Sequence, residues 1–218
     1  MDKLNPINMQ VIVVSFGGVG TTFFMQHLSR FKRINEIRDK DRLKHIQESL
    51  ITVNPDIRYV YIFGDPILSV ISLFKRGMQY PQSHKLQRDS NIKLGAIPES
   101  MSLSEYALIR IDRFLFRGHF YGWYKNRRKR RIAFVRYENM WDNIPKLADF
   151  LEVPAAFEND FPAKTARTST YDSISNNTLK GLQDMYGTLT NELRDKCDFE
   201  INQECGSHST RDDGNSTG

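Results

Sequence analysis

The stretch MQVIVVSFGGVGTT, residues 9–22, decides the fold. Met9 to Phe16 is a short run of mostly β-branched apolar residues, and it ends in glycines. Val19 to Phe31 continues with apolar residues at helical spacing. A buried strand, a glycine turn and a helix in this order are the building unit of parallel α/β sheets. The stretch therefore predicts a strand, a tight turn and a helix near the start of the chain.

Two later segments repeat the strand pattern. Ile57 to Phe63 and Ile132 to Tyr137 are short, apolar and rich in β-branched or aromatic residues. Asp65 is suited to cap a helix that starts at Pro66 and runs to about Arg76. Buried strands that alternate with helices predict a three-layer α/β fold, with a central parallel sheet flanked by helices. We expect the glycine turn at the carboxyl edge of that sheet.

The remaining segments give a coarser outline. Ser102 and Glu105 form a capping-box pattern, which opens what we predict to be the longest helix. Mixed polarity with little periodicity predicts a long loop or lid over residues 79–100. The helices expected besides those already named are Asp41–Leu50, Ser102–Trp123, Asp142 or Asn143 to Leu151, and Leu179–Leu193.

Composition favours one domain. A chain of 218 residues with 39% hydrophobic content can bury one sizeable core, which we expect within residues 1–201. Residues 202–218 lack apolar anchors and predict a disordered tail. No run approaches the roughly 20 apolar residues of a membrane span, and the start lacks the features of a secretory signal, so we expect a cytoplasmic location. Cys197 and Cys205 are predicted to be free thiols.

The positive charge is local. The net charge is +5, yet Lys125 to Arg131 alone carries six positive charges. We interpret this run as a solvated helix end that leads into a strand. It predicts no nucleic-acid partner.

The turn over Gly17, Gly18, Val19, Gly20, Thr21 and Thr22 predicts an anion site. Backbone amides at such a turn, together with the dipole of the following helix, bind phosphate without a charged side chain. A Walker A loop is excluded, because Ser15 holds its first glycine position and Thr21 its lysine position. A dinucleotide fingerprint also fails, since Phe23 stands where the third glycine is needed.

Three motifs, taken together, resemble those of the sulfotransferases that use 3'-phosphoadenosine 5'-phosphosulfate (PAPS). Ser15 to Phe23 overlays the family's phosphosulfate loop, commonly T-Y-P-K-S-G-T-T-W. Gly64 to Ser72 is similar to its 3'-phosphate segment, roughly R-D-P-R-D-V-x-V-S. Val135 to Met140 is similar to its V-R-Y-E-D-L segment. The resemblance implies a P-loop-like fold, PAPS as co-substrate, a hydroxyl acceptor and no metal.

Two departures remove charge from the site that the resemblance implies. The family's lysine in the loop corresponds to Gly18, and its arginine on the 3'-phosphate corresponds to Gly64. A contact of this kind contributes on the order of 2–4 kcal/mol to a transition state. Ser69, Ser72 and Arg76 lie at spacings that share one helix face and could compensate. Lys44 and Arg167 are further candidates, the latter in a basic segment over residues 164–169 that is similar to the family's closing segment.

Sulfuryl transfer also needs a base for the acceptor's proton. We predict His45, with Asp39, Asp41, His84 and His119 as alternatives. The predicted function is transfer of a sulfuryl group from PAPS to a glycan or small metabolite. Two alternatives stay open: a noncatalytic nucleotide-binding module, favoured by the two missing cations, and a kinase with Asp65 on magnesium. Pro66 argues against the kinase, because it makes Asp65 a better helix cap.

Overall fold

Three parallel strands carry the site. The computed structural model describes residues 4, 8–88, 90–196 and 199–202. β1 (Val11–Ser15), β2 (Arg58–Phe63) and β3 (Arg131–Arg136) pair in parallel in that order. The predicted parallel sheet is therefore confirmed. A fourth strand, β4 (Phe199–Asn202), pairs antiparallel with β3 and was not predicted.

The predicted tail started at residue 202, but Asn202 is the last residue of β4. The predicted tail therefore began at least one residue too early. The rest of that region, residues 203–218, lies outside the described residues, as do Cys197 and Cys205. No helix within the described ranges is long and apolar enough to cross a membrane.

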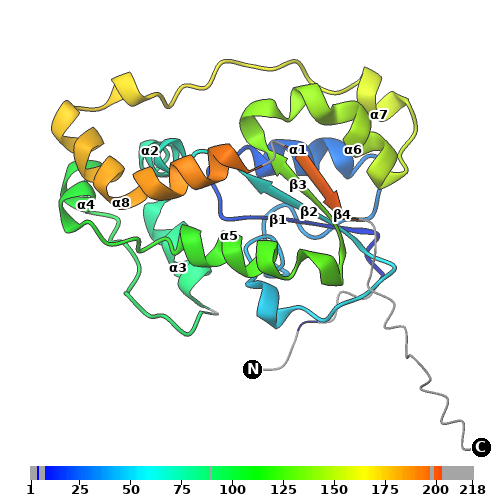
Figure 1. Ribbon diagram of the computed structural model, residues 1–218, viewed down its shortest axis with the longest axis horizontal. Coiled ribbons are helices and arrows are strands. Elements are labelled where there is room, and N and C mark those ends of the chain that lie inside the picture. The colour runs from blue at the N-terminus through cyan, green and yellow to red at the C-terminus, as the bar shows by residue number, and fades with distance from the viewer. Residues whose placement is uncertain (1–3, 5–7, 89, 197–198, 203–218) are drawn as a thin grey trace, which may run out of the picture.

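Helices cover both faces of the sheet. Figure 1 shows α1 (Thr21–Leu28) and α6 (Ile144–Leu151) above the strands and α5 (Phe116–Lys125) below them. On the α5 side, the rings of Tyr59 and Tyr61 contact Trp123, with centroids 5.8 and 6.1 Å apart. Val60, which lies between these two tyrosines in β2, is buried on the opposite face. Burial on both faces explains why the strands read as continuous apolar runs.

The other elements pack around this centre. α8 (Asn176–Asp195) lies against α2 (Pro66–Lys75) and α4 (Leu103–Ile109). The remaining helices are α3 (Gln79–Arg88) and α7 (Ala156–Asn159), with short 3-10 turns η1 (Glu48–Leu50), η2 (Arg127–Lys129), η3 (Tyr137–Asn139), η4 (Trp141–Asn143) and η5 (Tyr171–Ser173).

The predicted start of α2 is confirmed. The Asp65 carboxylate accepts from the backbone N–H groups of Ile67 and Leu68 at 2.8 and 3.2 Å, and Pro66 occupies the first turn. These bonds pair amides that a helix start leaves free. The capping box of Ser102 and Glu105 at the start of α4 is also confirmed.

The single long helix predicted over Ser102–Trp123 is wrong. α4 and α5 are separated at Arg110 and Leu115, which have left-handed φ angles of 54° and 55°. Between them, the Asp112 carboxylate accepts a hydrogen bond of 2.8 Å from the Tyr186 hydroxyl of α8. This tertiary contact turns the chain inward. α8, at 20 residues, is longer than either.

The helix predicted over Asp41–Leu50 is also wrong, since only the turn η1 forms there. The Asp41 carboxylate accepts from the amides of Glu36 and Leu43, at 2.6 and 3.2 Å, and Asp39 accepts from the amide of Lys44 at 3.0 Å. Aspartate side chains that bind nearby amides replace helical bonding with turns. This segment is therefore a tightly bonded loop.

The loop predicted over residues 79–100 is corrected for its first half, which forms α3. α3 buries a mostly polar face: Gln79, Gln82, Ser83, Leu86 and Gln87. Gln87 donates to the carbonyls of Gly95 and Arg113, at 3.0 and 2.6 Å. Its side-chain amide thus supplies hydrogen-bond partners to backbone outside regular secondary structure. An apolar-periodicity test misses such a helix, because the buried residues are polar.

One buried side chain pairs the middle of the outer edge of β1, while the amides of Val11 and Ser15 at its two ends donate to the carbonyls of Arg33 and Lys44. Asn35 is fully buried, and its amide donates to the Val13 carbonyl at 3.0 Å and accepts from the Val13 N–H at 2.8 Å. The side chain thus pairs both backbone groups of Val13 as a neighbouring strand would.

We predict that Asn35→Ala destabilises the fold by on the order of 2–3 kcal/mol, because both backbone groups of Val13 lose their partner in a buried place. Urea denaturation of the purified variant measures this loss. The exposed Asn91 gives a control, since Asn91→Ala should stay within about 0.5 kcal/mol of the parent. Equal stability of the two variants would contradict the role of Asn35.

Candidate functional site

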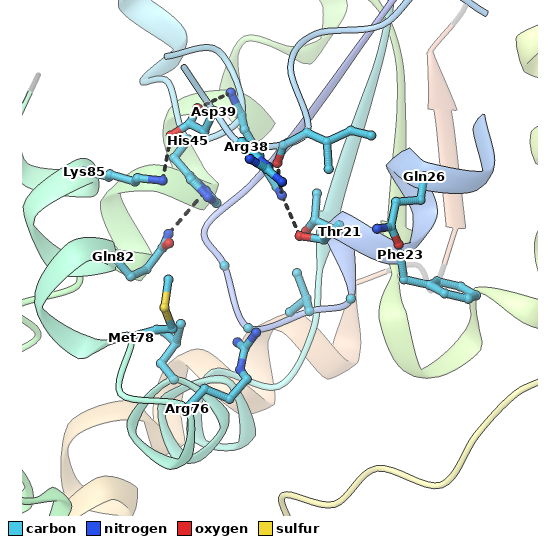
Figure 2. Close-up of a pocket in the computed structure, with 18 residues that line it drawn as sticks. Thr21, Phe23, Gln26, Arg38, Asp39, His45, Arg76, Met78, Gln82 and Lys85 are labelled. Atoms are coloured by element: carbon cyan, nitrogen blue, oxygen red, sulfur yellow. Dashed lines mark hydrogen bonds and ion pairs between the residues drawn. The ribbon is translucent and has the colours of Figure 1, made fainter. Parts of the chain in front are cut away.

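A cavity of about 640 Å³ opens where β1 ends and α1 begins. It lies at the predicted carboxyl edge of the sheet, and Figure 2 shows side chains converging on it from several elements. Its lining comprises the glycine turn with the residues after it, the segment after α1, the end of α2 and one face of α3: Gly17, Gly18, Val19, Gly20, Thr21, Thr22, Phe23, Gln26, Ile37, Arg38, Asp39, Lys44, His45, Leu73, Arg76, Met78, Gln82 and Lys85.

The glycine turn needs its glycines. Gly17, Gly18 and Gly20 have φ angles of 97°, 73° and 66°, which only glycine adopts readily. A Cβ atom at Gly18 would lie 2.8 Å from the Ser69 carbonyl oxygen of α2. The lysine that the resembling family carries at this position therefore does not fit here. A cation for this site has to come from another part of the chain.

Lys44 brings such a cation to the start of α1. Its ammonium donates to the Thr22 hydroxyl at 2.7 Å and to the Ile37 carbonyl at 3.0 Å. The side chain is largely buried, and this burial lowers the pKa of Lys44 to about 8, although the nearby Asp39 opposes the shift. Through its bond to Thr22, the ammonium lies at the first turn of α1, and helix N-termini are places where anions bind.

The two threonines of the turn differ in role. The Thr21 hydroxyl is buried and donates to the Ser15 hydroxyl at 2.7 Å, so it ties the turn to β1. Thr22 is exposed and accepts from Lys44. Of the two, Thr22 has the hydroxyl that a bound anion can reach.

His45 lies beside the turn as a neutral base. Its Nδ1 is 2.7 Å from the Ser15 carbonyl oxygen, which can only accept, so Nδ1 carries the proton and Nε2 is the basic nitrogen. Burial lowers the pKa of His45 to about 4, with Asp39 opposing the shift. The ring is therefore unprotonated on Nε2 at neutral pH.

The alternative bases are engaged elsewhere. His119 is fully buried between the Tyr61 hydroxyl at 2.8 Å and the His45 carbonyl at 3.3 Å, and burial lowers its pKa to about 3. Asp41 binds backbone amides, and His84 stacks on Tyr80 with ring centroids 6.0 Å apart. None of these three side chains lines the cavity.

Arg76 lines the cavity, and Ser72 does not. Arg76 donates from Nε to the Ser72 carbonyl at 3.0 Å, and Figure 2 shows its guanidinium directed from the end of α2 toward the glycine turn. Burial, and then the neighbouring charge of Arg167, lower the pKa of Arg76. Among the residues that the structure describes, no carboxylate pairs with it. Ser69 is not available for a ligand, since its hydroxyl donates to the Asp65 carbonyl at 2.8 Å.

Arg167 reaches the turn from the segment before α8. It donates to the Gly18 carbonyl at 3.0 Å and pairs with Glu138 at 3.1 Å. It does not line the cavity, and it holds the outer side of the turn instead. Lys164 donates to the Glu138 carbonyl at 2.7 Å, so this basic segment closes over the residues that follow β3.

Asp65 has both carboxylate oxygens engaged. One caps α2, and the other accepts a hydrogen bond from the Tyr171 hydroxyl. This arrangement favours the reading of Asp65 as a structural cap over that of a magnesium ligand.

Sequence reasoning missed the part of the site that α3 supplies. Gln82 and Lys85 line the cavity from this helix, and Arg38 lines it from the segment after α1. Lys85 pairs with the buried Asp39 carboxylate at 3.2 Å. The signal that could have found α3 is the helical spacing of its polar residues.

The lining of the cavity carries four cationic side chains, Arg38, Lys44, Arg76 and Lys85, and the carboxylate of Asp39. This excess of positive charge suits an anionic ligand.

Comparisons with known proteins give one family and one similar fold. A family model described as a sulfotransferase domain matches residues 28–201. The match begins at the last residue of α1, so the glycine turn lies outside it. No curated protein matches the chain. Mouse sulfotransferase SULT7A1, solved in complex with PAP, has the same fold, with a TM-score of 0.56 over 89% of this chain and 91% of that chain, at 11% sequence identity.

The family model covers most of the chain, and the sheet, the helices around it and the overall fold agree with a sulfotransferase structure. The chain belongs to the sulfotransferase family.

Proposed function

We propose that this protein transfers a sulfuryl group from PAPS to a hydroxyl of a glycan or small metabolite. The observation that carries the proposal is the Lys44 ammonium bound to Thr22 at the start of α1, with the neutral ring of His45 on the same cavity. One group can hold the leaving phosphate, and the other can take the acceptor's proton. The cytoplasmic location stays a prediction.

The cavity fits the anionic end of such a donor. Three glycines with left-handed φ angles line it, the α1 N-terminus adds its dipole, and cationic side chains outnumber carboxylates on the lining. The donor supplies a sulfuryl group activated as a mixed anhydride with phosphate. In this proposal Gly17, Gly18, Val19, Gly20, Thr21, Thr22 and Arg76 hold it from the cavity lining, while Ser72 and Arg167, which lie outside that lining, contact the donor beyond the cavity. The mouse relative named above was solved with PAP, which supports the choice of nucleotide.

Lys44 supplies the positive charge that the family's loop lysine provides and for which the position of Gly18 has no room. In sulfuryl transfer the acceptor oxygen bonds to sulfur while the bond from sulfur to the bridging oxygen breaks, so negative charge grows on the phosphate. Lys44 lies in a largely buried place, where a positive charge stabilises such an anion strongly. Arg76 points toward the same turn and adds a second cation.

His45 accepts the proton that the acceptor hydroxyl loses. Its Nδ1–H is bound to the Ser15 carbonyl, which fixes the ring and leaves the Nε2 lone pair for this step. Because burial holds its pKa near 4, the base is available across the neutral range.

Nucleotide preference tests the proposal. We expect adenosine 3',5'-bisphosphate to bind tightly in calorimetric titration and to exceed magnesium ATP in affinity. Thr22→Ala should weaken this binding by about tenfold to a hundredfold, because its hydroxyl faces the anion site and takes part in a charge-assisted network. A preference for magnesium ATP would refute the proposal. Binding without sulfuryl transfer to any hydroxyl acceptor would instead support the noncatalytic module.

The pH dependence of kcat/KM tests Lys44. The charged form of Lys44 is the active one, and it is lost as the pH rises through its pKa of about 8, so kcat/KM should fall above that pH. Lys44→Arg should abolish this alkaline limb while keeping part of the activity, since a guanidinium stays charged. Lys44→Met should lose both the limb and most of the activity. An alkaline limb that persists in Lys44→Arg would assign it to another group.

Arg76→Met tests the second cation, because it keeps much of the apolar stem and removes the charge. If Arg76 holds the 3'-phosphate, the variant should lose affinity selectively for adenosine 3',5'-bisphosphate over the 3'-dephospho nucleotide. If Arg76 binds the phosphosulfate end instead, the variant should lose affinity for both nucleotides to the same extent. Arg110→Met is the control, since Arg110 is exposed and pairs with Asp184 away from the cavity. Unchanged affinity for both nucleotides would remove Arg76 from the site.

A further inference from the structure

Two consecutive carbonyls at the end of β1 are each bound by a side chain. The Ser15 carbonyl accepts from His45 Nδ1 at 2.7 Å, and the next one, of Phe16, accepts from the Gln82 amide at 2.9 Å. Ser15 and Phe16 are the last residues before the glycines. The start of the anion-binding turn is therefore fixed from the segment after α1 and from α3 at once.

The Gln82 side chain is pressed against both partners. It is almost fully buried, and a Cβ atom at Gly17 would lie 2.6 Å from its amide nitrogen. The same nitrogen lies 3.2 Å from His45 Nδ1, as Figure 2 shows. Since Nδ1 is protonated by its bond to Ser15, this contact joins two donors, and the Gln82 amide donates to Phe16 instead.

Such a contact has an electrostatic consequence for His45. The positive end of the Gln82 amide dipole faces the ring and disfavours a second proton on it. The other charged and titratable groups that act on His45 are Asp39, which favours the protonated ring, and Lys44, Lys85 and the neutral ring of His119, which do not. Gln82 is the polar side chain that touches both the ring and the turn.

We propose that Gln82 is a positioning residue that sets the anion-binding turn and the base His45 relative to each other, and that keeps His45 neutral. Gln82 acts through these groups and is not itself a reactant. The chemical meaning of the inference rests on the proposed function, because His45 is the base only there. The geometry that it describes does not depend on that function.

The test replaces the amide by a carboxylate of the same shape. In Gln82→Glu, a negative charge next to His45 Nδ1 should raise the pKa of His45 by about 1–3 units. The side chain also loses its donor to the Phe16 carbonyl, so affinity for adenosine 3',5'-bisphosphate should fall by about threefold to tenfold. The imidazole signal of His45 in the full-length protein, followed by NMR against pH and assigned with His45→Gln, reports the pKa whether or not the protein is an enzyme.

Gln87→Glu is the matched control. Gln87 lies on the same helix, is equally buried, and binds the Gly95 and Arg113 carbonyls away from the cavity. The Gln87→Glu variant should destabilise α3 without changing the pKa of His45. A shift of His45 in Gln82→Glu alone supports the proposal. No shift, or an equal shift in Gln87→Glu, overturns it and leaves Gln82 as ordinary packing.

A second pair of variants decides the question if Gln82→Glu does not fold. Gln82→Met keeps the volume and removes the donor to Phe16, so it should weaken binding of adenosine 3',5'-bisphosphate, whereas Gln87→Met should leave that affinity unchanged. Equal affinities in the two Met variants would overturn the proposal. If neither parent nor variant binds the nucleotide, the proposed function fails, and the His45 titration in the Gln82→Met and Gln87→Met proteins still tests the positioning role.

Discussion

At its three glycines the turn after β1 lies so close to its surroundings that a side chain has no room there, and the rest of the site follows from this constraint. A Cβ atom would overlap the backbone of α2 at Ser69 from Gly18, the amide of Gln82 on α3 from Gly17, and the ring of Tyr137 from Gly20. The turn is thus wedged between segments that come from distant parts of the sequence. Its contacts set the walls of the cavity.

This crowding determines where positive charge can come from. A side chain at Gly18 would overlap α2, so the turn itself offers only backbone amides and hydroxyls. Lys44 supplies the charge instead, from a segment whose turns are made by the carboxylates of Asp39 and Asp41. A helix was predicted to start at Asp41, but the two aspartates shape a loop instead, and this loop carries both Lys44 and His45.

Buried side-chain amides bind backbone groups that regular secondary structure leaves without a partner. Asn35 pairs Val13 in the middle of β1, Gln82 binds the start of the turn, and Gln87 holds the segments that follow α3. An amide has both donors and an acceptor, so it can satisfy carbonyls and N–H groups that regular pairing leaves open, without adding a charge. The site thus obtains rigid backbone around a neutral histidine and a partly dehydrated lysine.

The sequence by itself determined the parallel strands, the glycine turn, the cap of α2 and the family, because each depends on neighbouring residues whose spacing has a direct physical meaning. It also singled out His45, which lines the cavity and whose role as the base stays a prediction. The tertiary structure alone decided the break between α4 and α5, where Tyr186 binds Asp112, and the helix α3, whose buried face is polar. It alone placed Lys44 against Thr22. Such contacts join residues far apart in the chain, and local propensity or periodicity holds no information on which distant partner will satisfy a buried polar group.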